Sequence, residues 1–164
     1  MLPNKNNTTQ IKEPPMNDQV TPSIEQEQLL ERMGFAGTIP FVALTLLLWL
    51  VEEDLHPFIS IALVAYGAVI ASFLGGIHWG IAFIKHSEHQ RFHLIWGITL
   101  SLLSWLAVLL PAFSGLPFLG FLIITAYLVD RKSYQYAGLK ALLTLRFRLT
   151  VVASISCFIA AGAT

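Results

Sequence analysis

Apolar residues along this chain gather into five long runs that are separated by short polar connections. The runs cover about residues 35–51, 58–84, 94–110, 116–129 and 146–163. An apolar helix of about 20 residues crosses the hydrocarbon layer of a bilayer, so we predict five transmembrane helices within residues 34–164. The predicted fold class is therefore an all-α integral membrane bundle. The fourth and fifth runs are short, which leaves a four-span or re-entrant version open.

The polar segments outside these runs have their own predicted structures. Residues 1–22 contain four prolines among Asn, Thr and Gln and little that a core could bury, so we expect a disordered polar tail. This tail has no apolar segment typical of a signal peptide. Residues 23–33 are predicted to form a short interfacial helix that leads to the first span. Residues 133–145 are predicted to be an interfacial helix or an inward extension of the fifth span.

The ten Lys and Arg residues can all be placed on one side of a membrane. The connections around residues 52–54 and 113–115 carry none of them. Cytoplasmic loops are enriched in Lys and Arg, so we expect the N-terminus inside and the C-terminus outside, in a bacterial inner (cytoplasmic) membrane. The lipid bilayer is the expected partner of this basic rim. Nucleic-acid binding would need a dedicated basic domain, which the sequence lacks.

The second apolar run separates its small residues from its bulky ones when it is drawn as a helix. Small residues and one tryptophan gather on one side: Ala68, Ser72, Gly75, Gly76 and Trp79, with Gly80 at the edge. The other side holds Leu63, Tyr66, Ile70, Phe73, Ile77 and Ile81. Small residues let a second backbone approach, so we expect this side to pack on another helix of the chain. It could instead bind a membrane-protein partner or a second copy, while the bulky side faces lipid.

His78 is the only His, Asp, Glu, Lys or Arg between residues 59 and 84. At 1.5 Å per residue it lies about 10 Å from the bilayer centre, and an ionisable residue at that depth is a candidate functional site. One interpretation is a hydrogen bond that locks helix packing, and the other is handling of protons, ions or substrate. Candidate hydrogen-bond partners are Ser101, Ser104, Asp130 and groups of the inner loop.

Three charged residues follow at the predicted inner interface. Asp130 ends the fourth apolar run and is expected to act as a stop signal and anchor for that helix. Arg146 and Arg148 flank the fifth run and can extend to lipid headgroups. A pair between Asp130 and Arg146 would instead tie the fourth and fifth spans together.

Candidate sites for chemistry are few. His86, His89 and His93 would share one helical face, and three imidazoles can bind zinc or copper. The alternative is a solvated loop, so we expect neither a metal nor a cofactor. No catalytic residue is assigned, because the sequence contains no phosphate loop, nucleophile elbow or zinc-protease helix.

Several segments resemble the motifs of one family of small multi-pass membrane proteins. Tyr66–Gly80, which ends in Gly75-Gly76-Ile77-His78-Trp79-Gly80, resembles the most specific motif of that family. Gly37–Phe41 resembles the opening motif of the family, and Ser101–Trp105, which includes Ser104 and Trp105, resembles its third-span motif. Asp130 and Leu145–Thr150 resemble its closing elements. The family is domain-of-unknown-function family 3429, the transmembrane-protein-sixty-nine-like proteins. The resemblance covers roughly residues 34–160 and implies a five-helix membrane domain without an established activity.

Three functions are compatible with these features. The first is a non-enzymatic accessory or assembly protein, in which the small-residue side of the second helix packs on partners. The second is a small transporter or channel, in which Ser72 and His78 line a polar path. The third is an enzyme that acts on a lipid-phase substrate.

Overall fold

The chain folds into a bundle of helices, and the computed structural model describes residues 24–84, 90–137 and 141–164. The elements are α1 (Ile24–Ala36), α2 (Ile39–Leu50), the 3-10 turn η1 (Glu53–Leu55), α3 (His56–Ile84), α4 (Gln90–Leu109), α5 (Ala112–Ala137) and α6 (Ala141–Ala161). Within these residues there is no β-strand. Five segments are long and apolar enough to cross a membrane: Gln28–Leu50, Glu53–Phe83, Gln90–Leu109, Ala112–Tyr134 and Leu142–Ala161. The predicted all-α membrane bundle is confirmed.

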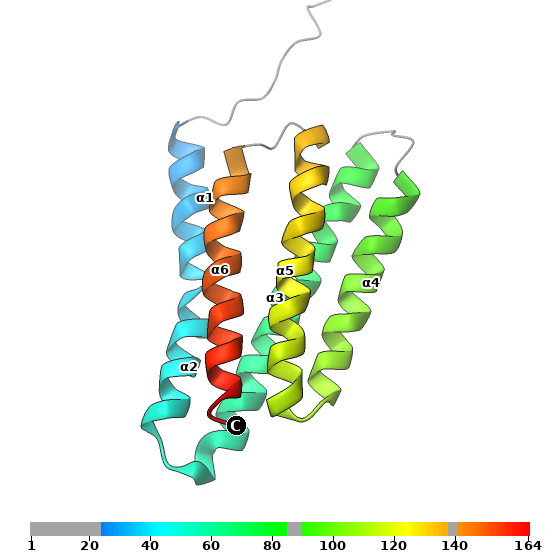
Figure 1. Cartoon of the computed structure of the whole chain (residues 1–164). Coiled ribbons are helices and arrows are strands. Elements are labelled where there is room, and N and C mark those ends of the chain that lie inside the picture. Colours follow the sequence, from blue (N-terminus) through cyan, green and yellow to red (C-terminus); the bar gives the residue numbers. More distant parts are fainter. Residues whose placement is uncertain (1–23, 85–89, 138–140) are drawn as a thin grey trace, which may run out of the picture.

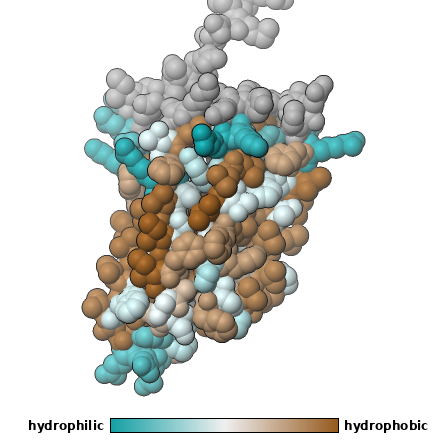
Figure 2. Space-filling view, in the orientation of Figure 1, coloured by the Kyte–Doolittle hydropathy of each residue, from teal (hydrophilic) through white to brown (hydrophobic). Residues whose placement is uncertain are grey.

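The two ends of the bundle differ in charge. The α2–α3 and α4–α5 connections and the C-terminus lie at one end, and α1 begins at the other, where α3 and α5 end (Figure 1). Hydrophilic residues cap both ends of an apolar belt (Figure 2). We call the end at which α1 begins the basic end, because the described cations lie toward it: Arg32, Arg91, Arg131, Lys132, Arg146 and Arg148. The opposite end carries Glu52, Glu53 and Asp54.

The first span differs from its predicted boundary. Residues 23–33 were expected to form a separate interfacial helix, but α1 stacks end to end on α2 (Figure 1), and the apolar stretch begins at Gln28. A single turn at Gly37 and Thr38 interrupts the rod. Pro40 has no N–H and is tolerated in the first turn of a helix, and it occupies that position in α2. Pro40 is therefore compatible with a new helix that begins at Ile39, directly after this turn.

The fourth and fifth spans are longer than predicted. α5 starts at Ala112 and continues to Ala137, where the sequence indicated about residues 116–129. The expectation that Asp130 stops this helix was wrong: Asp130 is buried inside it and is satisfied by residues of other helices. α6 begins at Ala141, so residues 141–145 extend the fifth span. Residues 133–137 extend the fourth, and residues 138–140 lie outside the described part.

α3 is the central helix, and α4 packs closely along its small-residue side. A Cβ atom added to Gly75 would lie 2.6 Å from the carbonyl oxygen of Gly97 in α4. The Ser72 hydroxyl donates to the Ser101 hydroxyl at 3.0 Å. Gly76 and Gly80 differ, because an added Cβ would meet no neighbouring atom of the described residues within 4 Å. Part of the small-residue side is therefore used within the chain and part is open.

Most of the bulky side of α3 does not face lipid as expected. Leu63 is fully buried, and the Tyr66 hydroxyl donates to the carbonyl oxygen of Gly37 at 2.7 Å. The Tyr66 ring also meets Phe41 of α2 edge-on. Of the six bulky residues, Phe73 is exposed as expected. A central helix has neighbours on several sides, so the rest of its exposed strip runs along other positions, which include Ile61, Val69, Gly76, Gly80 and Phe83.

The contact of Gly75 with Gly97 gives a prediction with a neighbouring control. We expect Gly75→Ala to lower the free energy of unfolding by about 1–3 kcal/mol, because the added methyl group overpacks the α3–α4 interface. Gly76→Ala should be neutral or slightly stabilising, because its Cβ has space and alanine favours helix. Thermal unfolding in detergent measures both variants. Equal unfolding temperatures for the two would contradict the close α3–α4 approach.

Candidate functional site

Four ionisable side chains meet inside the bundle, one from each of four helices. We call His78 of α3, His93 of α4, Asp130 of α5 and Arg146 of α6 the polar cluster. His78 is 0% exposed and Asp130 is 1% exposed, while His93 is also buried. Buried charges in proteins are normally paired, so the contacts among these four residues decide what the site can do.

The cluster is a connected string of hydrogen bonds. His78 Nε2 lies 2.8 Å from Asp130 Oδ1, and Arg146 donates to the other carboxylate oxygen. Because an ionised carboxylate only accepts, His78 Nε2 donates to it. His78 Nδ1 lies 2.9 Å from His93 Nδ1, so one nitrogen donates and the other accepts. When His78 is neutral with its proton on Nε2, the proton of this second bond belongs to His93.

The sequence explains why these residues meet. His78 follows Gly75 by one helical turn, and His93 precedes Gly97 by one turn. The close contact of the two glycines therefore brings the two imidazole rings together, with centroids 5.2 Å apart. Asp130 and Arg146 lie at equal distances along the chain from residue 138, so the antiparallel pair α5 and α6 places them at one level.

The charges of the cluster balance. A carboxylate that is moved out of water loses several kcal/mol of solvation, which a close cation and hydrogen bonds offset. Asp130 has both, from Arg146 and His78. The Nε of Arg146 is buried and has no acceptor among the described residues. The guanidinium therefore keeps an unused hydrogen-bond donor, whereas His78 and Asp130 are bonded to each other.

An apolar groove lies next to the cluster. It has a volume of about 430 Å³ and runs between α1 and α2 on one side and α3, α5 and α6 on the other. Arg146 and Tyr134 belong to its wall, and Tyr134 is 2% exposed. We call this space the groove. The cluster and the groove share the Arg146 side chain.

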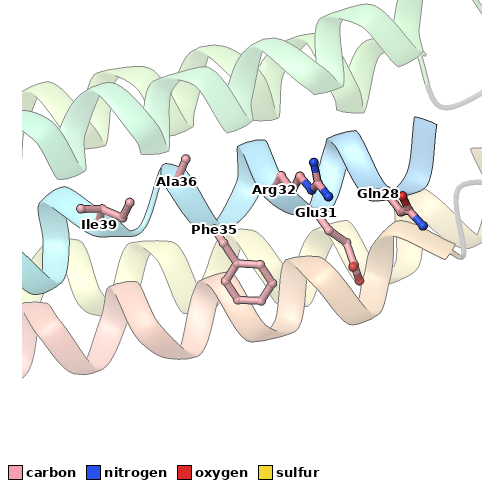
Figure 3. A pocket seen from close by; sticks show the side chains of 6 residues that line it. All are labelled: Gln28, Glu31, Arg32, Phe35, Ala36 and Ile39. Atoms are coloured by element: carbon pink, nitrogen blue, oxygen red, sulfur yellow. The ribbon is translucent and has the colours of Figure 1, made fainter. Parts of the chain in front are cut away.

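A second hollow, of about 490 Å³, lies along α1. Figure 3 shows its six lining residues, all from α1 and the first residue of α2: Gln28, Glu31, Arg32, Phe35, Ala36 and Ile39. Glu31 and Arg32 are exposed. The hollow is therefore a feature of one helical surface and lacks the converging elements of a binding site.

The other residues singled out from the sequence lie outside the cluster. The Ser104 hydroxyl donates to Leu100 O of its own helix, and Trp105 is exposed. Trp79 Nε1 donates to Leu94 O at 3.2 Å, which ties α3 to α4. Arg148 is exposed. Of the partners considered for His78, the structure selects Asp130.

The histidine set of the sequence analysis is divided. His86 and His89 lie outside the described residues, whereas His93 faces His78. In the described ranges, no three His, Cys, Asp or Glu side chains have an arrangement that could hold a metal ion. The pairing of His93 with His78 was missed, and the spacing of both histidines from Gly75 and Gly97 is the signal that could have found it.

Comparisons with known proteins place the chain. The family model described as "Protein of unknown function (DUF3429)" matches residues 27–162. Transmembrane protein 69 of Xenopus tropicalis is 43% identical over 79 residues, which are 47% of this chain and 31% of the relative. The Mus musculus protein of the same name is 36% identical over 76 residues, 45% of this chain and 31% of the relative. No solved structure matches the chain.

The matched segment thus spans about a third of the length of these relatives. The family model, in contrast, covers nearly all of the described residues, including every member of the polar cluster. This multi-pass membrane protein belongs to the DUF3429 family.

Proposed function

We propose that this protein is a non-enzymatic accessory or assembly protein of the membrane. The observation that carries the proposal is that the polar cluster is used internally. His78 bonds through both ring nitrogens and Asp130 through both carboxylate oxygens. A general acid or base must be able to reach a substrate, whereas these groups join four helices to one another.

The open part of α3 supports a role in assembly. Gly76 and Gly80 lie one turn apart on the exposed side, where an added Cβ would have no neighbouring atom within 4 Å in the described part of the chain. Small residues spaced in this way let a second transmembrane helix approach closely. We assign this face to a transmembrane helix of a partner membrane protein.

One observation favours a second function, a small proton-coupled transporter. Three proton-binding groups, His93, His78 and Asp130, follow one another at hydrogen-bonding distances of 2.9 and 2.8 Å. Intramembrane strings of His and Asp are used as proton relays in pumps and transporters. A relay would need these bonds to break and re-form, whereas a helix lock needs them to persist.

We also propose the orientation. The described Lys and Arg residues lie toward the basic end, and positive residues are retained in the cytoplasm during insertion. The basic end would therefore face the cytosol of a bacterium, and the protein would lie in its inner membrane. The N-terminus would then be inside and the C-terminus outside.

Substitution of His78 distinguishes a helix lock from a relay. We expect His78→Ala to lower the free energy of unfolding in detergent by about 1–3 kcal/mol, because Asp130 loses a buried donor. His78→Gln should retain stability, because its amide can donate to the carboxylate. Ser104→Ala is the buried control.

In liposomes with a pH-sensitive dye, the wild-type protein should conduct no more protons than empty vesicles. A wild-type flux that His78→Gln abolishes without loss of stability would establish the transporter instead.

Bulk on the open face of α3 tests the assembly role. We expect Gly76→Leu with Gly80→Leu to remove a membrane protein that cross-links to the wild-type chain in its native membrane, because the leucines prevent backbone approach. Thermal stability should be retained, because no described residue packs on these glycines. Ala62→Leu, at another exposed position of α3, is the control and should keep the cross-link. If the cross-linked product contains two copies of this chain, the face belongs to a homo-oligomer and the proposed partner protein is rejected.

Cysteine labelling tests the orientation. Single cysteines at residues 53 and 114 should react with an impermeant reagent added to bacterial cells without an outer membrane, because residue 53 in η1 and residue 114 in the first turn of α5 lie at the end opposite the basic end. Cysteines at residues 88 and 138 should react only after the cells are opened. The native Cys157 is buried and serves as the background. Labelling of residues 88 or 138 from outside would reverse the proposed orientation.

A further inference from the structure

We propose that the groove binds one acyl chain of an anionic phospholipid and that Arg146 holds the phosphate of that lipid. The proposal concerns a different surface from the open glycines of α3. It therefore stands or falls independently of the accessory role.

The groove has the size and surface of a lipid-chain site. Its volume of about 430 Å³ lies within the range of roughly 300–1,000 Å³ that is typical of ligand sites. Its walls include the apolar side chains of Met33, Phe41, Ile70, Phe73 and Ile77. An empty space of this kind forfeits van der Waals contacts, and in a bilayer the nearest apolar molecule is a lipid chain.

The groove also has a direction. Arg146 is five residues from the start of α6, near the basic end. Ala153, further along the same wall, lies about 10 Å deeper in the bundle at 1.5 Å per residue. A molecule with a polar head at Arg146 can thus extend its apolar chain toward the middle of the membrane. This is the orientation of a phospholipid from the leaflet at the basic end.

Charge selects the head of the ligand. Among the described residues that line the groove, Arg146 is the only charged one. Arginine has five N–H donors. One bond goes to Asp130, and Nε lacks an acceptor within the described ranges. Charge-assisted bonds of arginine to phosphate are strong, and basic pockets between transmembrane helices bind anionic lipid heads.

The other classes of occupant fit less well. A water-soluble anion would leave the apolar walls without a partner. A lipid without phosphate would give the guanidinium no anionic acceptor beyond Asp130, and the phosphate of a zwitterionic lipid is already offset by the cation of its own head. The segment of residues 1–23, which lies outside the described part, contains prolines and polar residues and offers no long apolar run. An anionic phospholipid matches both halves of the groove.

Competition between two lipids tests the proposal. The purified full-length chain is mixed in detergent with equal amounts of dioleoylphosphatidylglycerol and dioleoylphosphatidylcholine, and bound lipids are counted by native mass spectrometry. We expect a preference for the phosphatidylglycerol of about fivefold, the effect of one basic side chain near an anionic head. In the double variant Asp130→Asn with Arg146→Gln, which leaves no unpaired buried charge, the preference should fall to about one. Arg148→Gln, at an exposed neighbour, should keep it.

A groove-filling variant leaves the polar cluster intact. Ile70→Trp should reduce total bound lipid several-fold, whereas Val69→Trp, on the exposed side of the same turn, should not. Thermal unfolding verifies that each variant is folded. Equal binding of the two lipids by the wild-type chain, or unchanged binding by Ile70→Trp, overturns the proposal. Lipid binding that appears only after removal of residues 1–23 also overturns it, because the groove would then belong to that segment.

Discussion

A carboxylate buried within a membrane-spanning helix determines how the helices of this bundle align. Asp130 is 1% exposed, and an unpaired charge at such a position would be strongly destabilising. It must therefore meet a cation and a donor, which are Arg146 and His78. Meeting both fixes the axial positions of α3, α5 and α6 relative to one another. The bond of His78 to His93 adds α4 to the same level.

Close packing supplies a second, independent constraint. Hydrophobic attraction does not drive helices together within lipid, so association depends on tight contacts and hydrogen bonds. The approach of Gly75 to Gly97 provides the tight contact, and the hydrogen bond between Ser72 and Ser101 adds to it. These contacts lie within two turns of His78. The same register therefore satisfies the backbone contact and the buried charge, which makes alternative alignments of α3 and α4 costly.

The spans could be predicted from the sequence because the bilayer imposes a length of apolar chain that composition reveals. The ends of α5 could not. An aspartate after an apolar run reads as a helix stop, and its contacts with His78 and with Arg146, both distant in the sequence, are what allow Asp130 to be an interior residue. His93 likewise read as part of a loop with His86 and His89. Its partner is His78, because the contact of Gly75 with Gly97 brings the two histidines together. That contact depends on how α3 and α4 pack, which a local sequence pattern does not reveal.

The position of Arg146 has a consequence for both proposals. Its guanidinium contacts Asp130 on one side and lines the groove on the other. An anion bound in the groove would compete with Asp130 for the same cation. The stability of the contact between α5 and α6 would then depend on the composition of the surrounding membrane.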